Sequence, residues 1–353
     1  SYKHAGVEMF TRNSLVGLDI GCHEIKAIEL VESADGPQVN ALATMPAVDA
    51  VELPQAIRSL FAGAGIKTRN VAVSLSGQSV IVRYIAMPKM SEEDLLSSMK
   101  YEAGKHIPFE LDEVALDCAR LDKGEAASGE EEADEMQVLL VAAKKEVLNE
   151  LLGVLRAAAL TPLAVDVDGF ALGSAFELYA SSKSTAGELA GVKALVDVGA
   201  SKTSVNILED GSSSFSREIY LAGKDFTDAV SRRLGVEQQE GDSIKQDPAG
   251  ADCEVRDCLS SVVGDLVAEV HASVDYFENH HDRTVDSVWI SGGSAHLPGL
   301  ADAFEQVFCR EVKEWNPLEG IGVAEGAENL SLETVNASGL AVAVGLASRV
   351  LDY

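Results

Sequence analysis

The sequence predicts an α/β protein whose two halves are built alike, and three observations support this. Residues 15–21 and 195–199 each have the pattern of a strand that ends in Asp-x-Gly and leads through a short polar turn into a second strand. Runs of β-branched residues alternate with amphipathic helical segments in both halves. The length of 353 residues is sufficient for two or three domains. An internal repeat of this kind usually indicates two similar domains that face one another.

Charge and composition exclude several classes of protein. Lys and Arg number 28 against 57 Asp and Glu, which gives a net charge of −29 at pH 7. Phosphate backbones and anionic lipids would repel such a chain, so we expect no nucleic-acid partner. The apolar runs are shorter than the roughly 18 residues of a spanning helix, so we expect no direct membrane insertion. Cysteines without CxxC spacing indicate a reduced, cytoplasmic protein.

The elements of the first half follow one another in a regular order. We expect a hairpin of two strands over residues 15–20 and 25–31, and a third strand over residues 38–45. A helix over residues 53–61 and two further strands over residues 71–75 and 80–86 follow. Met9 is the expected native start, and residues 1–8 are excluded from the fold.

A segment of different character spans residues 87–160. Ser91 is the expected cap of a helix that ends before Pro108, because its hydroxyl can accept a hydrogen bond from the first free N–H groups and Asp94 follows three residues later. Two strands follow over residues 114–121 and 136–143, and the acidic stretch 122–135 lies between them. A second amphipathic helix covers residues 147–158. We interpret the acidic stretch as a solvated hairpin loop rather than as a docking site for a basic partner.

The second half repeats the opening hairpin. A strand, a helix and a small polar linker precede it, over residues 163–167, 170–179 and 180–191. The repeated hairpin, a long amphipathic helix, a buried strand and a closing helix follow, over residues 194–198 and 203–208, 255–277, 285–290, and 340–351. Trp289 is expected in the core, and Trp315 is expected to be partly exposed.

The repeated Asp-x-Gly turns indicate a nucleotide site. Glycine at a hairpin tip lets backbone N–H groups approach an anion, so each turn can cradle phosphate. Asp19 and Asp197 cannot bind phosphate directly, because both are anions, but they can hold it through Mg²⁺. With Lys26 as an added cation, the two carboxylates would clamp a Mg²⁺-nucleotide across a cleft. One Asp-x-Gly alone is more often a tight turn, and two at equivalent places favour the clamp.

A third block points to the same chemistry. A buried strand runs into Gly292 and Gly293, and a Pro-Gly pair and a helix follow. Adjacent glycines let the flat face of a base or ribose lie on the backbone. The three blocks in this order resemble those of the actin, chaperone and sugar-kinase ATPase superfamily. In its terms Asp19 marks phosphate-1, Asp197 marks phosphate-2 and the glycine pair marks the adenosine motif.

This resemblance implies ATP and Mg²⁺ as cofactors, with Asp19 and Asp197 as metal ligands and Lys245 as a base or ribose contact. The implied nucleotide-binding positions are Asp19, Gly21, Cys22, His23, Lys26, Asp197, Gly199, Ala200, Lys202, Thr203, Lys245, Gly292, Gly293 and Ser294. Asp168 is the candidate for orienting an attacking water, although residues 166–169 match the first connecting helix of the superfamily poorly. Nucleotide binding is therefore better supported than hydrolysis.

A closer likeness lies in three stretches of the middle segment: Met-Pro-Lys-Met at 87–90, Tyr-Glu-Ala-Gly-Lys-His-Ile-Pro-Phe at 101–109 and Asp-Glu-Val-Ala-Leu-Asp at 112–117. They resemble the FtsA-type proteins, and among those the PilM family of type IV pilus assembly. The resemblance implies an actin-like ATPase fold: two similar lobes, each with a mixed β-sheet flanked by helices, and an FtsA-like subdomain inserted as 1C. The implied subdomains are 1A (9–86 and 161–188), 1C (87–160), 2A (189–224 and 285–353) and 2B (225–284).

The family resemblance implies a cytoplasmic ATP-binding scaffold of the pilus machine. Such a protein would hold the amino-terminal tail of the inner-membrane protein PilN in a groove beside 1C, contact other assembly components, and reach the inner face of the inner membrane through its partner. Alternatives are an FtsA-like cell-division or filament-forming protein and a small-molecule kinase of the superfamily. FtsA proper usually adds a carboxy-terminal membrane helix, which we do not find, and a kinase needs a general base that no motif supplies. A homodimer stays open.

Overall fold

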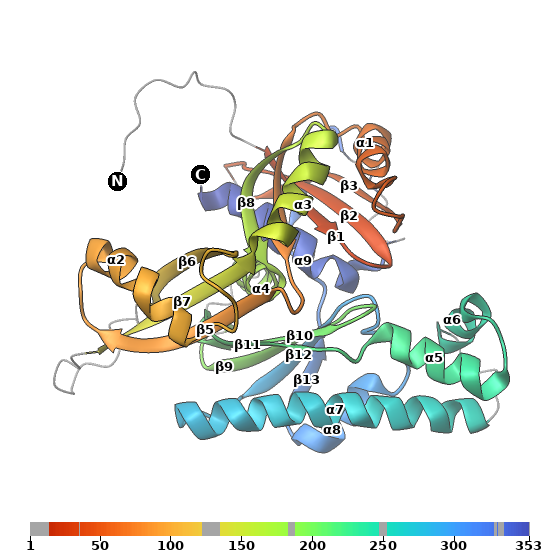
Figure 1. The fold of residues 1–353 in the computed structure, drawn as a ribbon. Helices are drawn as coiled ribbons and strands as arrows, with labels where there is room; N and C mark the ends of the chain where they lie inside the picture. The colour runs from red at the N-terminus through yellow and green to blue at the C-terminus, as the bar shows by residue number, and fades with distance from the viewer. Residues whose placement is uncertain are drawn as a thin grey trace. The chain divides into compact units, whose positions relative to one another are not determined.

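The computed structural model describes residues 14–34, 36–121, 135–182, 188–246, 253–327, 330 and 335–352 (Figure 1). The chain forms two compact units. The larger combines the chain up to Ser74 with the chain from Ala158 onward, and the smaller is Leu75–Ala157. The expected start at Met9, most of the acidic stretch 122–135 and the middle of the linker 180–191 lie outside the described residues.

The first sheet of the larger unit begins with an antiparallel meander, and its fourth strand in sequence pairs in parallel with the first. Its order is β14-β3-β2-β1-β4-β8. The strands are β1 (Ser14–Ile20), β2 (Glu24–Val31), β3 (Gln38–Pro46), β4 (Asn70–Leu75), β8 (Thr161–Val167) and β14 (Gly322–Val323). Helix α1 (Leu53–Gly63) connects β3 to β4, and it buries one face that includes Ile57 and Phe61.

The second sheet repeats this scheme. Three strands form an antiparallel meander, and the next strand in the sheet pairs in parallel with the first of them. The order is β11-β10-β9-β12-β13, which matches β3-β2-β1-β4-β8 strand for strand. The strands are β9 (Val192–Val198), β10 (Thr203–Glu209), β11 (Ser212–Ile219), β12 (Ser287–Ser291) and β13 (Glu311–Glu314). The predicted internal repeat is therefore confirmed.

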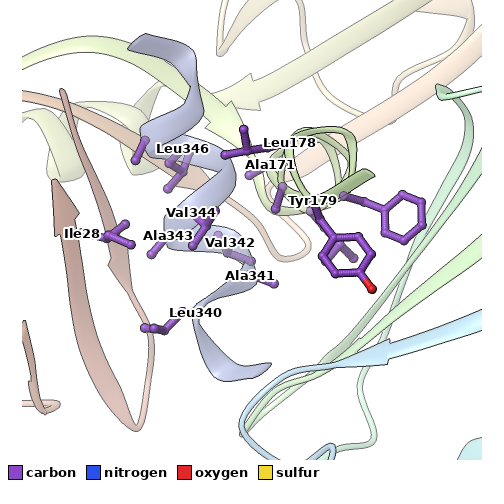
Figure 2. Packing of buried hydrophobic residues seen from close by; sticks show 14 of the residues in the cluster. Ile28, Ala171, Leu178, Tyr179, Leu340, Ala341, Val342, Ala343, Val344 and Leu346 are labelled. Atoms are coloured by element: carbon purple, nitrogen blue, oxygen red, sulfur yellow. The ribbon is translucent and has the colours of Figure 1, made fainter. Parts of the chain in front are cut away.

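Helices α4 (Asp168–Ser182) and α9 (Ala341–Ala347) form the centre of the larger unit. Figure 2 shows small side chains of α9, among them Ala343 and Val344, packed between α4 and the strand that carries Ile28. Glycine permits this close approach, because a Cβ at Gly345 would meet the carbonyl of Ala171. α9 is thereby wedged into the core, and short 3₁₀ turns continue it at both ends, η4 (Ala337–Leu340) and η5 (Ser348–Asp352).

The remaining helices of the larger unit share a hydrophobic core with the second sheet. The long amphipathic helix α7 runs along this sheet (Figure 1) and buries a stripe of Val, Leu and Phe residues against it. The helices are α5 (Gly223–Leu234), α6 (Gln238–Gln246), α7 (Cys253–His281) and α8 (Leu300–Phe308). Trp289 lies in the core as predicted, whereas the expected exposure of Trp315 is wrong. Trp315 is 2% exposed, because it packs edge-on against Phe176 and Tyr179.

The smaller unit is a three-stranded antiparallel sheet in the order β5-β7-β6 with two helices. The elements are β5 (Val80–Pro88), α2 (Glu92–Glu102), η1 (Ala103–Lys105), β6 (Val114–Leu121), β7 (Glu135–Lys144) and α3 (Lys145–Ala157). Ser91 caps α2 as predicted, and its Oγ accepts a hydrogen bond from the N–H of Asp94 at 3.2 Å.

The smaller unit begins at Leu75 rather than at residue 87. The reason is that β5 pairs along its whole length with β7, from Val80 opposite Ala143 to Pro88 opposite Glu135. The assignment of four subdomains remains a prediction. Among the helices in the described part of the chain, none combines the length and apolar character that crossing a bilayer requires.

Candidate functional site

The first Asp-x-Gly turn joins β1 to β2. Gly21 donates its N–H to the carbonyl of Glu24 at 3.1 Å, which closes the turn and leaves Cys22 and His23 exposed at its tip. Asp19 lies directly opposite Lys26 in the strand register. Their side chains form an ion pair of 3.0 Å and are only 15% and 17% exposed. The cation that the sequence suggested for the clamp is therefore the direct partner of Asp19.

The second turn, between β9 and β10, has the same backbone. Gly199 donates its N–H to the carbonyl of Lys202 at 3.0 Å. Asp197, however, lies opposite Ser204 rather than opposite a lysine. Its Oδ1 accepts a hydrogen bond of 3.0 Å from the hydroxyl of Ser291, which is its register partner on β12. Within the described residues, no lysine or arginine lies at ion-pair distance from Asp197.

The glycine pair follows β12 and stacks against the end of β9. Gly292 has φ +103°, and a Cβ there would meet the backbone of Val198. Gly293, by contrast, faces open space. Ser294 donates its N–H to the carbonyl of Val198 at 3.0 Å, and Asn336 donates its side-chain amide to the carbonyl of Gly293 at 3.1 Å. The turn is thus fixed from behind while one glycine surface remains free.

Lys202 points away from Asp197 and bridges two other carboxylates. Its Nζ is 2.7 Å from Asp168 Oδ2, at the start of α4, and 2.7 Å from Glu218 Oε1 on β11. Thr203 is fully buried, and its hydroxyl donates to the carbonyl of Leu221 at 2.8 Å. Asp168 therefore lies in the same cluster as the two turns, whereas Thr203 lies behind its turn.

Helix α5 begins directly against the second turn. The N–H of Gly223 donates to the carbonyl of Gly199 at 3.0 Å, and the N–H of Lys224 donates to the carbonyl of Ala200 at 2.7 Å. A Cβ at Gly223 would meet the Ser294 hydroxyl. This close contact brings α5, the second turn and the glycine-pair turn to one place.

Lys245 on α6 lies beside this helix start. Its Nζ is 2.6 Å from Asp242 Oδ1, 3.0 Å from the Thr227 hydroxyl and 3.2 Å from the carbonyl of Gly223. Burial alone would raise the pKa of Asp242, but the hydrogen bond and charge of Lys245 hold that pKa below its usual value. His23 on the first turn acts in the same direction. The first turn therefore lies within electrostatic reach of α6.

The pKa values report how deeply the carboxylates are set. Burial raises the pKa of Asp19, although Lys26 opposes that shift. Burial also raises the pKa of Asp197 to about 6, although Lys26 and the Ser291 hydrogen bond lower it. Asp168 adds to the rise at both positions, because like charges disfavour ionisation. The cluster therefore carries more negative charge than its lysines neutralise.

These residues fit a Mg²⁺-nucleotide. Carboxylate oxygens are the ligands that Mg²⁺ prefers, and it usually takes one or two of them together with waters and phosphate oxygens. In the described part of the chain, no group of three or more His, Cys, Asp or Glu side chains could hold a metal ion by itself. A metal at Asp19 and Asp197 would therefore need phosphate oxygens to complete its ligands, as in a nucleotide complex.

Sequence reasoning missed several members of the cluster. Ser291 and Glu218 are in place only through strand register, opposite Asp197 and beside Lys202. The carbonyl of Ser338 accepts a hydrogen bond from the N–H of Gly292 at 2.9 Å, which ties the glycine-pair turn to η4, the 3₁₀ turn before α9. The available signal for Ser291 was the parallel pairing of β9 with β12. Because parallel strands end at the same edge of a sheet, Ser291 at the end of β12 lies beside Asp197 near the end of β9.

Comparisons with known proteins bear on the family and the fold. A sequence profile described as Type IV pilus assembly protein PilM matches residues 17–351. A chain of a PilM-PilN type IV pilus biogenesis complex is similar with a TM-score of 0.82 and 29% identity, over 96% of this chain and 98% of that one. The ethanolamine utilization protein EutJ from Carboxydothermus hydrogenoformans shares the fold, with a TM-score of 0.55 and 16% identity over 95% of this chain and 89% of its own.

The fold is therefore the actin-like ATPase fold, as the sequence predicted. In each of its two similar sheets, the first strand in sequence leads into an Asp-x-Gly turn. The profile match extends over nearly the whole chain. On this evidence the chain belongs to the PilM family of type IV pilus assembly proteins.

Proposed function

We propose that this chain is an ATP-binding scaffold of type IV pilus assembly that binds the amino-terminal cytoplasmic tail of a PilN-like inner-membrane protein. The observation that carries the nucleotide part is the placement of both Asp-x-Gly turns, the glycine-pair turn and α6 beside one another, with Asp19 close enough to raise the pKa of Asp197. The partner is supported by the similarity to a chain of the PilM-PilN complex.

In this proposal each part of the site has its own task. The backbone N–H groups of the two turns hold the phosphates, and Asp19 and Asp197 hold Mg²⁺, which neutralises phosphate charge. The open face of Gly293 accepts the base or ribose, with Lys245 at its edge. Cys22 and His23 contribute their backbone at the tip of the first turn.

The smaller unit is the proposed docking place for the partner tail. Its helix α2 carries two exposed apolar side chains, Leu96 and Tyr101, of which Tyr101 is 81% exposed. Ile107, by contrast, is buried in the core of this unit. An exposed aromatic residue of this size is a common anchor for a bound peptide. The proposed location is the cytoplasm at the inner face of the inner membrane, reached through this partner.

Calorimetric titration with Mg-ATP tests the nucleotide site. We expect the Asp19→Ala and Asp197→Ala variants to bind about tenfold more weakly than wild type, or worse, because each loses a Mg²⁺ ligand. Asp302→Ala is the matched control, since Asp302 is exposed in the first turn of α8 and lies outside the cluster. Equal affinity in wild type and both cluster variants would contradict the proposed clamp.

A pull-down with a synthetic peptide of the partner's amino terminus tests the docking place. The full chain should retain the peptide and not a scrambled version, and Tyr101→Ala should weaken retention. Tyr276→Ala is the control, because Tyr276 is also an exposed tyrosine but belongs to α7 of the larger unit. Repeating the experiment with and without Mg-ATP reports whether nucleotide and partner binding are coupled. Retention unaffected by Tyr101→Ala would place the tail elsewhere.

A further inference from the structure

Lys202 is a partly buried lysine that bridges two carboxylates within the candidate nucleotide site. Its Nζ is 2.7 Å from Asp168 Oδ2 and 2.7 Å from Glu218 Oε1. The three side chains are 19%, 14% and 22% exposed. Glu218 is held in turn by the hydroxyl of Tyr220 at 3.2 Å. The bridge is therefore a fixed arrangement rather than a loose surface pair.

The fold does not require a lysine at this position. The second turn is closed through the backbone of Lys202, whose carbonyl accepts the N–H of Gly199, and any side chain would leave that bond intact. The equivalent position of the first turn is Glu24, which has the opposite charge. The Lys202 ammonium is thus explained by its contacts to carboxylates and not by the turn.

The ammonium stays charged in this place. Burial alone would lower the pKa of Lys202, but the attraction of Asp168 and Glu218 outweighs it, so the pKa is raised above its usual value. Asp168 is consequently paired with a permanent cation. Asp168 is also the residue at the start of α4 that the sequence singled out for orienting an attacking water.

We propose that Lys202 silences Asp168, so that this protein binds ATP but does not turn it over at an appreciable rate. This inference rests on the proposed function. In hydrolysis, the oxygen of water forms a bond to the γ-phosphorus while the bond to the β–γ bridging oxygen breaks, and a carboxylate accepts a hydrogen bond from the water and takes its proton. Lys202 holds Oδ2 of Asp168 in an ion pair and offsets part of its charge, so the carboxylate is a poor acceptor for the proton of a water.

The same ammonium also changes how strongly binding depends on Mg²⁺. The cluster contains the carboxylates of Asp19, Asp168, Asp197 and Glu218 and the ammonium groups of Lys26 and Lys202. Loss of Lys202 removes one of its two cations. Free ATP would then be repelled more strongly, and a divalent cation would be needed more to offset the negative charge. This second consequence can be measured without any catalytic turnover.

The Lys202→Ser variant of the full chain tests both consequences. We expect its ATP hydrolysis under single-turnover conditions to rise about tenfold or more above wild type. We also expect the ratio of calorimetric ATP affinities, with Mg²⁺ over with EDTA, to rise about tenfold. Adding Asp168→Asn to this variant should abolish the gain in hydrolysis. Lys202→Arg retains a cation beside Asp168, so it should show a smaller gain in hydrolysis than Lys202→Ser.

A second lysine serves as matched control. Lys193 at the start of β9 is also largely buried, and its Nζ lies 4.0 Å from Asp286, but it is outside the cluster. Lys193→Ser should change neither hydrolysis nor the Mg²⁺ ratio, and equal changes in this variant would overturn the inference. Should Lys202→Ser not fold, Lys202→Gln carries the same expectations with a longer neutral side chain.

The outcomes separate the inference from the proposed function. Wild type that binds Mg-ATP, together with a folded Lys202→Ser variant that shows neither gain, overturns the role of Lys202 and leaves the nucleotide site intact. Wild type that fails to bind Mg-ATP overturns the proposed function, and the inference fails with it. Faster hydrolysis that depends on Asp168 supports both.

Discussion

The two Asp-x-Gly turns have the same backbone and different electrostatics. Each is closed by a glycine N–H bonded to the carbonyl three residues later, at 3.1 Å in the first and 3.0 Å in the second. Asp19 forms an ion pair with Lys26 across the hairpin, whereas Asp197, among the residues that the structure describes, has no ion pair and accepts a hydrogen bond from the hydroxyl of Ser291. A duplicated backbone thus carries one carboxylate with its own cation and one without. We infer that Asp197 is the carboxylate whose negative charge a bound cation would neutralise.

The second turn can be broken through the glycine pair that supports it. Gly292→Ala should destabilise the protein by about 4 kcal/mol, because φ is +103° and a Cβ would press on the backbone of Val198 beside Asp197. Backbone atoms cannot move aside as a flexible side chain can. Urea unfolding followed by circular dichroism measures this loss, and a variant as stable as wild type would contradict the packing argument.

The neighbouring glycine gives the matched control. Gly293 lies outside the left-handed region and faces open space, so Gly293→Ala should change the free energy of unfolding by less than about 1 kcal/mol. The new methyl group projects where the base or ribose is proposed to lie, so Mg-ATP affinity should fall about tenfold. We therefore expect Gly292→Ala to affect mainly stability and Gly293→Ala to affect mainly nucleotide affinity.

The first turn can be broken by removing its cation. Lys26→Met leaves Asp19 buried without its partner, and this should cost about 3 kcal/mol of stability at pH 8. The loss should be smaller at pH 5, since burial raises the pKa of Asp19 and protonation relieves the unpaired charge. Lys105→Met in the exposed pair with Glu102 is the control, with an expected change within about 0.5 kcal/mol.

Only part of this contrast between the two turns could be predicted from the sequence. The pattern of each turn is local, so the two strands, the glycines and the carboxylates were predictable. The Asp19–Lys26 pair follows from the hairpin register, because both residues lie equally far from the turn. The contact of Lys202, in the turn before β10, with Asp168 at the start of α4 joins residues 34 positions apart, and no local pattern encodes it. Charges that meet through tertiary packing therefore escape sequence reasoning.

The same limit applies to the fold. Alternating apolar patterns predicted the sheets, and the capping residue Ser91 predicted the start of α2. Composition placed the start of the middle segment at residue 87, whereas the smaller compact unit begins at Leu75, because the pairing of β5 with β7 is a long-range choice that composition does not reveal. The subdomain bounds themselves stay a prediction. Trp315 was expected to be partly exposed from its polar neighbours, whereas its ring fills the space beside Phe176. Local polarity does not indicate which large side chain a core needs.

The smallest expected effect is a gain in stability at the second turn. Asp197→Asn removes a buried charge and retains an oxygen that accepts the Ser291 hydrogen bond. In the folded protein the pKa of Asp197 is raised to about 6 from its ordinary value of 3.8, so the folded state binds its proton more tightly than the unfolded state. The free energy of unfolding therefore decreases through Asp197 as pH rises from about 4 to about 6, and this decrease persists at higher pH.

Asp197→Asn avoids this loss and should be more stable than wild type by about 2 kcal/mol at pH 8, with the difference vanishing near pH 3.5. Thermal unfolding of the nucleotide-free protein over this pH range measures the effect. The variant should at the same time gain less stability than wild type from added Mg-ATP, because stabilisation by a ligand follows its affinity. A variant with no gain at pH 8 would mean that the Asp197 charge is already compensated, and the two turns would then be electrostatically alike. A gain in stability combined with weaker nucleotide binding would show instead that the second turn retains a destabilising carboxylate for the cation it binds.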